Sequence, residues 1–399
     1  MNILMPIYSC DPEGESERLI GFDWLQQISR QHQVFLITPV RYKKALEKRI
    51  TRKVTAYYLP VPEFGNLEIL SGIAPGYFVF MVKAYFLARK IIKDHKVDII
   101  HRVTPIAFRF PDLFVTLGLP CVIGPVGGGL KPLAAFPSVF KKENFMYQLR
   151  RLDDARFLYD PWLRYTYTRA ARILITCNYV KDIIPFQYHH KLRLKSEATI
   201  NTADYPCVIE RRSPVARLLY VGRFIPLKAV NLLIRALQGI SWEDPQVDFQ
   251  ATLIGDGGDY YQYCRDMVKK AGLEKKITFL GRLKREAIIA YYHSHDIFCF
   301  PSLKESSGCV VMEAMSCGIP VIVADRGGPA EIVAEGCGLK IAVHTEEDFV
   351  RRLKEAILLM IKDKDLRHTC AANARRWIEN KYDTDSIAAM VTSVYKEIL

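Results

Sequence analysis

Hydrophobic positions along the chain fall into short apolar runs separated by longer stretches with helical spacing. Between Asp296 and Val333, the apolar run Ile297–Phe300 is followed by a polar loop and then by a helical pattern over residues 309–316. Gly318 is placed to end that helix, and Val321–Ala324 forms the next apolar run. Strand, short helix and strand make a parallel crossover unit, which is right-handed in nearly every known case.

The same succession opens both halves of the chain. Asn2–Tyr8 predicts a strand, a helical pattern containing Trp24 follows, and Val34–Thr38 predicts the next strand. Leu218–Val221 begins a similar pattern in the second half. Such alternation predicts an α/β fold with parallel sheets, whose ligand sites lie beyond the carboxyl ends of the strands. Further strands are predicted at Val97–His101, Pro120–Ile123, Ile173–Thr176, Ala251–Gly255 and Ile277–Gly281, and helices at 41–53, Phe78–Ile92 and 385–399.

A chain of 399 residues predicts two or three domains. The segment 191–214 is polar and basic and contains Pro206, which is typical of a linker. We therefore expect one domain over residues 1–199 and a second over residues 200–384.

The loop after the strand at 297–300 holds the most informative side chains. An anion is expected at the start of the following helix, where unpaired N–H groups and the positive end of the helix dipole lie. Glu305 and Glu313 flank that point, but eight residues of helix rise about 12 Å, beyond the roughly 5–9.5 Å between the carboxylates of a glycosidase. One long ligand, a sugar–diphosphate–nucleoside, explains both carboxylates. The alternative is a solvated Glu305 and a helix-surface Glu313.

This stretch resembles the signature of glycosyltransferase family 4, the retaining enzymes of the GT-B fold. The family carries two glutamates separated by seven residues, which here are Glu305 and Glu313, followed by Ala314-Met315, Gly318 and Pro320-Val321. The resemblance implies two Rossmann-like, doubly wound domains that face each other across a cleft, with the C-terminal helix packed on the first domain. It also implies that Glu305 contacts the donor sugar and Glu313 the ribose of the nucleotide.

A second motif, Gly222-Arg223 followed by Lys228, resembles the Gly-Arg-(four residues)-Lys-Gly motif of the same family, with Ala229 in place of the last glycine. The resemblance implies that both cations hold the donor diphosphate and stabilise the departing nucleotide, in place of a divalent ion. Taken singly, each could be a structural ion pair. The remaining donor-binding candidates are Gly255, Asp256, Gly257, Arg282, Leu283, Ser306, Ser307, Gly308, Cys309 and Val310.

The acceptor is expected on the first domain. The string Gly124–Gly129 (GPVGGG) follows a buried strand and also occurs in a branch of the family linked to surface-polysaccharide assembly. We expect it to form the floor of the cleft, the alternative being a flexible turn. His101 is a candidate to orient a sugar, with a structural histidine as the alternative, and completes a catalytic set with Glu305, Arg223 and Lys228. The acceptor candidates are Ser16, Glu17, Gly21, His101, Thr104, Gly127, Gly128 and Gly129.

Charge is unevenly distributed along the chain. Residues 1–199 hold 29 Lys and Arg against 17 Asp and Glu, whereas residues 200–399 hold 27 against 26. The first half is therefore expected to face something anionic. Residues 140–172 interleave arginine and lysine with aromatic residues, which suits an anionic membrane or nucleic acid. No nucleic-acid-binding motif accompanies them, so we favour peripheral membrane contact, with a helix pair of buried aromatics as the alternative.

Several features indicate a cytoplasmic protein. No basic-then-apolar leader opens the sequence, and the apolar stretch Ile69–Val82 is shorter than the ~20 residues that span a bilayer. The 10 cysteines form no CxxC pair, which predicts reduced thiols. No cluster of His, Cys and carboxylates has metal-ligand spacing, so we predict no metal and no cofactor.

Together these features predict a retaining glycosyltransferase that moves a sugar from a UDP- or GDP-sugar to an acceptor hydroxyl, in polysaccharide, glycolipid or glycoconjugate synthesis. The acceptor is expected to be a glycan, a lipid-linked molecule or another hydroxyl compound. Alternatives are a nucleotide-sugar epimerase or phosphorylase of the same fold, since fold does not fix chemistry, and a non-catalytic scaffold of a polysaccharide-assembly complex.

Overall fold

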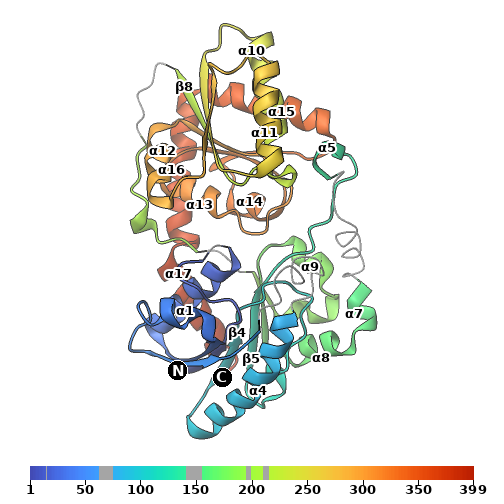
Figure 1. Ribbon diagram of the computed structural model, residues 1–399, viewed down its shortest axis with the longest axis vertical. Coiled ribbons are helices and arrows are strands. Elements are labelled where there is room, and N and C mark those ends of the chain that lie inside the picture. The colour runs from blue at the N-terminus through green and yellow to red at the C-terminus, as the bar shows by residue number, and fades with distance from the viewer. Residues whose placement is uncertain (15, 63–74, 141–154, 195–198, 210–214) are drawn as a thin grey trace. The chain divides into compact units, whose positions relative to one another are not determined.

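The computed structural model describes residues 1–14, 16–62, 75–140, 155–194, 199–209 and 215–399. Its contacts divide the chain into two compact units (Figure 1). Unit 1 consists of Met1–Gly129, Glu143–Thr199 and Thr384–Leu399, and unit 2 of Leu130–Lys142 and Ile200–Asp383. The first division of the chain therefore falls after Gly129, whereas the sequence placed all of residues 1–199 in one domain.

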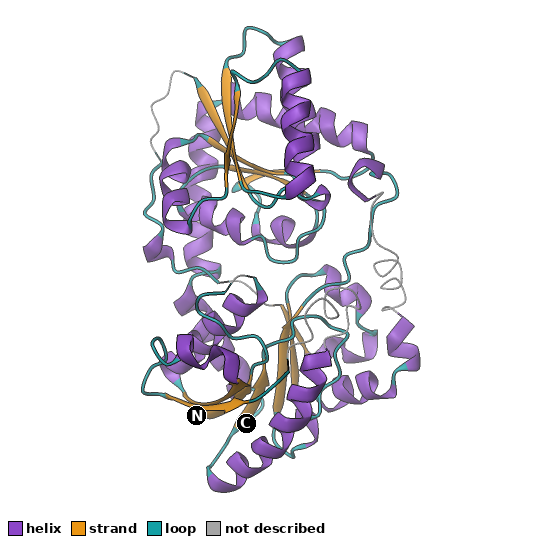
Figure 2. Cartoon of the chain, in the orientation of Figure 1, coloured by secondary structure: helices purple, strands orange, loops and turns teal. Residues whose placement is uncertain are grey.

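Unit 1 is built on a seven-stranded parallel sheet with strand order β3-β2-β1-β4-β5-β6-β7. Figure 2 shows helices packed on this sheet. Its strands are β1 (Asn2–Pro6), β2 (Gln33–Pro39), β3 (Val54–Leu59), β4 (Ile99–Arg102), β5 (Cys121–Val126), β6 (Arg172–Ile175) and β7 (Leu192–Leu194). Its helices are α1 (Glu17–Gln31), η1 (Val40–Tyr42), α2 (Lys43–Leu46), α4 (Pro75–Asp94), η2 (Phe114–Thr116), α7 (Arg156–Tyr159), α8 (Pro161–Arg169), α9 (Tyr179–Ile183), η4 (Phe186–Lys191) and α17 (Thr384–Lys396).

Two hydrophobic clusters cover the two faces of the unit 1 sheet. On one face, Trp24 of α1 and Val391 of α17 are buried against Leu36 of β2. On the other, Phe80 of α4 packs with Ile100 of β4. Each strand is apolar at successive positions and so contributes side chains to both clusters, because successive side chains of a strand point to opposite faces of the sheet.

Unit 2 has a six-stranded parallel sheet with strand order β10-β9-β8-β11-β12-β13. Its strands are β8 (Ala216–Val221), β9 (Phe249–Ile254), β10 (Ile277–Gly281), β11 (Ile297–Phe300), β12 (Val321–Ala324) and β13 (Gly338–Ile341). Its helices are α5 (Pro137–Phe140), η5 (Thr202–Asp204), η6 (Pro226–Lys228), α10 (Val230–Glu243), α11 (Gly258–Lys270), α12 (Arg285–Ser294), α13 (Cys309–Ser316), α14 (Gly327–Ile332), α15 (Glu346–Lys362) and α16 (Lys364–Lys381).

Both sheets share one doubly wound order, in which the first strand lies between the second and the fourth strand in chain order. The winding direction therefore reverses between β1 and β4 in unit 1 and between β8 and β11 in unit 2. In open parallel sheets, ligands bind beyond the carboxyl ends of the two strands at this reversal. The turn after β8 and the loop after β11 meet at that edge of unit 2.

The strongest sequence signals are confirmed, and several weaker ones are wrong. β11, α13 and β12 have the predicted bounds. By contrast, the basic run 41–53 is helical only as far as Leu46, and α14, which begins with Gly327-Gly328-Pro329, is not among the predicted helices. Glu15 and residues 141–154, which include part of the predicted aromatic and basic stretch, lie outside the described residues, as does part of the predicted linker. Across the described ranges, no helix is both long and apolar enough to span a bilayer.

Candidate active site

The turn after β8 is shaped by close packing against the glycine-rich turn after β9. Gly222 N–H donates to the Ile254 carbonyl at 2.9 Å, and Phe224 N–H donates to the Asp256 carbonyl at 2.6 Å. A Cβ on Gly255 would stand 1.9 Å from the Gly222 carbonyl oxygen. The two turns could not approach this closely with a larger residue there. The close packing of Gly222, Gly255 and Asp256 therefore fixes the backbone of the turn that leads to Lys228.

Lys228 is the best-defined cation of this edge. It closes the short helix η6, is 7% exposed, and its ammonium lies 5.4 Å from the centre of the Phe300 ring. Lys228 Nζ donates to Glu305 Oε2, so the cation and the carboxylate of two separate motifs form one ion pair. The sequence singled out both residues, and the fold brings them together across 77 positions of the chain.

Glu305 is held in its ionised form. Burial raises the pKa of its carboxyl, but the Lys228 ammonium and the backbone N–H groups of Ser307 and Gly308 outweigh that effect and lower the pKa below its usual range. Because the carboxylate accepts these bonds in the structure, an incoming hydroxyl meets a charged acceptor that is already oriented. This favours a role in binding sugar hydroxyls over a role as a general acid.

The loop from Glu305 ends at Gly308, where α13 begins. Gly308 has φ 69° and ψ 38°, in the left-handed region, and no side chain caps the helix there. Gly308 has no side chain that could cap the first N–H groups of α13, which begin next to the Lys228–Glu305 pair. An uncapped helix start beside a cation is suited to an anion.

Gly327 and Gly328, at the start of α14, pack against the backbone of the Glu305 loop. Gly328 N–H donates to the Glu305 carbonyl at 2.9 Å. A Cβ on Gly327, whose φ is +63°, would stand 2.3 Å from the same oxygen, and one on Gly328 would stand 2.3 Å from the Ser306 carbonyl. A glycine pair that begins three residues after the predicted strand Val321–Ala324 was the available signal.

Glu313 lies in a separate polar cluster on the second turn of α13. It is 8% exposed, its Oε1 lies 3.3 Å from Arg285 Nε, and its Oε2 accepts a hydrogen bond from Tyr292 at 3.1 Å. Arg285 also donates to the Tyr205 hydroxyl at 2.5 Å. Burial raises the pKa of the Glu313 carboxyl, although Arg285 and the two tyrosines oppose this. These three neighbours fix the carboxylate in position, and spacing alone did not reveal them.

The remaining donor-side candidates surround the same edge of unit 2. Arg223 follows Gly222 directly and is exposed, and within the described part of the chain its guanidinium forms no ion pair. Gly257 packs on the Phe224 carbonyl, where a Cβ would stand 1.8 Å away. Arg282 and Leu283 follow β10, and Ser306, Cys309 and Val310 are partly buried beside Gly308.

A segment from the first half of the chain also borders this edge. Residues 130–140, here called the strap, belong to unit 2. Phe136 is fully buried against Phe349 of α15, with ring centres 5.9 Å apart. Ser138 N–H donates to Glu346 at 3.2 Å, and its hydroxyl accepts from Asn231, three residues after Lys228, at 3.0 Å. The strap therefore braces the start of α10, and no pattern in the sequence predicted this contact.

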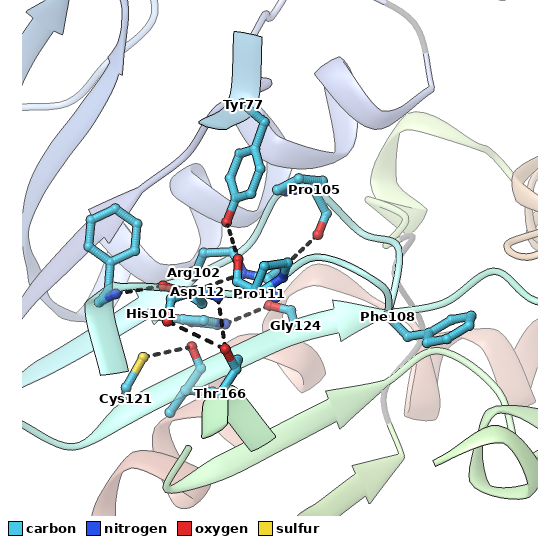
Figure 3. A network of polar contacts seen from close by, with 12 residues as sticks. Tyr77, His101, Arg102, Pro105, Phe108, Pro111, Asp112, Cys121, Gly124 and Thr166 are labelled. Carbon is cyan, nitrogen blue, oxygen red and sulfur yellow. Dashed lines mark hydrogen bonds and ion pairs between the residues drawn. The ribbon is translucent and has the colours of Figure 1, made fainter. Parts of the chain in front are cut away.

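In unit 1, His101 has the geometry of a structural histidine. Its Nε2 donates to the Gly124 carbonyl at 2.8 Å (Figure 3). Its Nδ1 therefore accepts from the Tyr395 hydroxyl at 2.5 Å. The side chain is fully buried, and burial lowers its pKa to about 4. Both ring nitrogens are engaged, which leaves no atom of His101 to meet a sugar.

The neighbouring Arg102 organises the loop after β4 from inside the core. It is 1% exposed, donates to Asp112 at 3.1 Å and also donates to the Pro105 carbonyl (Figure 3). Thr104 accepts a bond from Ser9 N–H at 2.9 Å, which ties this loop to the loop after β1. The edge of unit 1 at the strand reversal is thus a fixed surface.

Glu17 is partly exposed at that edge, and Gly127 is buried beneath it. Burial raises the pKa of the Glu17 carboxyl, while bonds from Ile106 N–H and the Ser9 side chain oppose the shift. Gly127 N–H donates to the Ile106 carbonyl at 2.7 Å, so the glycine string continues a parallel strand pairing and is not a loose turn.

The remaining acceptor candidates in unit 1 are Gly21, Gly128, Gly129 and Ser16. Gly128 and Gly129 have φ of +84° and +80°, directly before the chain enters unit 2. Gly21 allows the loop after β1 to approach α1, since a Cβ there would stand 1.9 Å from the Ser9 carbonyl. Ser16 precedes α1 with φ 54°.

Comparisons with known proteins show similar sequences and similar folds. An uncharacterized glycosyltransferase of Methanocaldococcus jannaschii is 27% identical over 320 residues, which are 80% of this chain and 81% of that protein. A solved glycosyltransferase of Rickettsia africae covers 99% of this chain and 98% of its own, with a TM-score of 0.68 and 17% identity. Anabaena HepE, solved in complex with UDP, covers 100% of both chains, with a TM-score of 0.66 and 18% identity.

Two doubly wound parallel sheets that match these structures define the GT-B fold, as predicted. Residues 208–377 match the family model of glycosyl transferases group 1, the grouping to which family 4 corresponds. Unit 2 therefore carries the group 1 domain, and the protein is a glycosyltransferase. The predicted enzyme class is confirmed, and transfer is favoured over the epimerase, phosphorylase and scaffold alternatives.

Proposed function

We propose that this glycosyltransferase moves a sugar, with retention of anomeric configuration, from a UDP- or GDP-sugar to an acceptor hydroxyl in polysaccharide, glycolipid or glycoconjugate synthesis. The observation that carries the proposal is the Lys228–Glu305 ion pair beside the uncapped start of α13, at the strand reversal of unit 2. There, Lys228 can bind a phosphate, and the adjacent Glu305 carboxylate can accept hydrogen bonds from sugar hydroxyls. Bound UDP in the structurally similar HepE supports a nucleotide donor.

Lys228, Arg223 and the first N–H groups of α13 hold the two phosphates of the donor. Lys228 is nearly buried, which strengthens its attraction to an anion, and Arg223 is exposed and can close on the diphosphate from solvent. As the sugar leaves, negative charge grows on the phosphate oxygen, and these fixed positive groups stabilise it. Their contribution increases in the transition state, which is what raises a rate.

Glu305 and Glu313 recognise the two ends of the donor. Glu305 accepts hydrogen bonds from hydroxyls of the transferred sugar, and Glu313 accepts them from the ribose. Arg285, Tyr205 and Tyr292 occupy three of the roughly four lone-pair sites of the Glu313 carboxylate, which leaves one for a ribose hydroxyl. Gly255, Gly257, Arg282 and Leu283 border the nucleotide end.

In the reaction, the bond between the anomeric carbon and the phosphate oxygen breaks, and a bond from that carbon to the acceptor oxygen forms. The acceptor proton passes to the departing phosphate oxygen on the same face of the sugar, so the configuration is retained. The nucleoside diphosphate leaves with that proton. Lys228 and Arg223 orient the phosphate oxygen that receives it.

The acceptor is proposed to bind on unit 1 at the strand reversal, near Ser16, Glu17, Thr104 and Gly127–Gly129. Glu17 is partly exposed and is oriented by Ser9 and Ile106, so it can accept a hydrogen bond from an acceptor hydroxyl. The GPVGGG string supports a place in the branch of the family linked to surface polysaccharide. His101 supports this surface from inside and contacts no substrate. We also propose a cytoplasmic location with peripheral contact to the inner face of a membrane.

Release of nucleotide from a panel of UDP-, GDP- and ADP-sugars tests the proposal. The wild-type protein should release one nucleoside diphosphate in the presence of an acceptor, while Glu305→Gln and Lys228→Ala should reduce the rate about 100-fold or more. Glu274→Gln, on an exposed glutamate of the same unit, is the matched control and should leave the rate unchanged. Equal rates for wild type and Glu305→Gln would contradict the site assignment.

A further inference from the structure

Large hydrophobic side chains gather on one part of unit 1 without a partner in the chain's core. Leu158 and Tyr159 at the end of α7 are 70% and 80% exposed, Trp162 and Tyr165 of α8 are 58% and 43% exposed, and Phe186 of η4 is 86% exposed. Isolated exposed hydrophobic residues are ordinary, but a group of them on adjoining elements marks an interaction surface.

These residues lie on elements that pack together. α7 and α8 lie side by side (Figure 1), and Tyr188 of η4 donates to the Arg164 carbonyl of α8 at 3.4 Å. Along α8, Trp162, Tyr165 and Arg169 recur at intervals of three and four residues, so they share one stripe of the helix. The opposite side of α8 carries its buried residues, Leu163, Thr166 and Tyr167.

Positive charge accompanies these aromatic residues. Residues 155–194 contain seven Lys and Arg against two Asp and Glu. Arg156, Arg172 and Arg193 are engaged in ion pairs, whereas Arg164 and Arg169 are exposed and form none within the described ranges. Burial, and to a smaller extent the nearby Arg172 and Arg169 charges, lower the pKa of Lys191.

We propose that the aromatic–basic surface formed by Leu158, Tyr159, Trp162, Tyr165, Phe186, Arg164 and Arg169 docks on an anionic phospholipid bilayer. Tryptophan and tyrosine favour the headgroup region, where an apolar ring and a polar edge are both satisfied. The two arginines meet lipid phosphates, and no helix has to enter the membrane. The proposal rests on the proposed function only for its purpose, which is to bring unit 1 close to a lipid-linked acceptor.

Flotation of the full-length protein with vesicles tests the surface without any donor or acceptor. The protein should float with equimolar phosphatidylcholine–phosphatidylglycerol vesicles and not with phosphatidylcholine alone. High salt should weaken the binding, because the screening length falls from about 10 Å at 0.1 M to about 3 Å at 1 M. Because turnover plays no part, this result is independent of the donor assignment.

Two variants separate the apolar and the electrostatic contributions. Arg164→Gln/Arg169→Gln should lower the partition constant for the anionic vesicles about 30-fold, the ratio that corresponds to about 1 kcal/mol for each arginine. The triple variant Tyr159→Ser/Trp162→Ser/Phe186→Ser should lower the partition constant further. With a water-soluble acceptor, its rate of nucleotide release should equal that of the wild type. Trp242→Ser, which alters an equally exposed tryptophan (66%) of unit 2, is the matched control and should bind as wild type.

Tryptophan fluorescence gives a second readout. Trp162 is exposed, so its emission should shift to shorter wavelength when anionic vesicles are added, and Trp162→Phe should lose that shift. Equal flotation with neutral vesicles, or unchanged binding of the triple variant, would overturn the proposal. Two other outcomes would also overturn it: binding of a single-stranded oligonucleotide that the same substitutions abolish, or a dimer in sedimentation that the triple variant converts to monomer.

Discussion

Replacing Glu305 by glutamine removes one charge from the Lys228–Glu305 pair and leaves the size of the side chain almost unchanged. In the structure, the carboxylate accepts from Lys228 Nζ and from the N–H groups of Ser307 and Gly308. Lys228 is 7% exposed, so in the variant its ammonium stays nearly buried without a counter-charge.

The cost to the unliganded protein follows from these contacts. A hydrogen bond to a charged group contributes roughly 1.5–3 kcal/mol, and breaking a fully buried ion pair costs about 3–5 kcal/mol. The glutamine oxygen can still accept from Lys228, and the Phe300 ring remains 5.4 Å from the ammonium. We therefore expect the free energy of unfolding to fall by about 2 kcal/mol, which lies within the range for one hydrogen bond to a charged group and below the range for a buried ion pair.

Nucleotide binding should respond in the opposite direction. In the wild type, Lys228 must leave Glu305 to reach a phosphate, and the Glu305 charge repels that phosphate. The variant removes both penalties, so UDP or GDP should bind about tenfold more tightly, which corresponds to about 1.4 kcal/mol. Sugar transfer should nevertheless fall, because the carboxylate that holds the sugar is gone.

Thermal unfolding with and without nucleotide, isothermal titration of UDP and GDP, and nucleotide release measure the three effects on one sample. Glu274→Gln serves as control in each assay. Weaker nucleotide binding by a folded Glu305→Gln variant would refute the idea that Glu305 and phosphate compete for Lys228.

Three further predictions concern the pH response of this pair, the glycine beneath the Glu305 loop, and His101 of unit 1. Because the pKa of Glu305 is lowered in the fold, the ion pair stabilises the folded protein at neutral pH and loses this effect as the pH falls through that pKa. The difference in unfolding free energy between wild type and Glu305→Gln should therefore close below about pH 4, the ordinary range of a glutamate carboxyl. Urea titrations at several pH values measure this difference. Gly327→Ala should cost about 3 kcal/mol and raise the KM for donor, because its Cβ would stand 2.3 Å from the Glu305 carbonyl. Gly272→Ala, with a similar φ of +67° and open space around it, should cost only about 1 kcal/mol in the same unfolding assay. His101→Phe should lower stability by about 3 kcal/mol, since two buried partners lose their bonds, while kcat per folded molecule stays unchanged; a selective loss of kcat would contradict its structural role.

The sequence predicted elements well where an apolar run is bounded by specific turn residues. β11, α13 and β12 were predicted to the residue, because Pro301, Gly308, Gly318 and Pro320 mark their ends. α14 was missed because it opens with Gly327-Gly328-Pro329, which is typical of a loop, although proline is tolerated in the first turn of a helix. β7 was missed because it is three residues long within a basic segment.

The sequence motifs predicted which residues belong to the site, but they did not predict which residues contact each other there. Lys228 and Glu305 each belong to a local motif, but their pairing depends on the neighbouring positions of β8 and β11 in the sheet. The contacts of Glu313 with Arg285 and Tyr292 join α13 to α12, and the strap belongs to unit 2 although residues 143–199 of unit 1 separate it from the rest of that unit. Such long-range contacts leave no periodic signal in a single sequence.

A crystal structure with bound UDP or GDP tests the central claim most directly. We predict the diphosphate oxygens within hydrogen-bonding distance of Lys228 Nζ, the Arg223 guanidinium and the first N–H groups of α13, with the ribose at Glu313. A diphosphate bound away from the turn after β8, with Lys228 still paired to Glu305, would contradict the account.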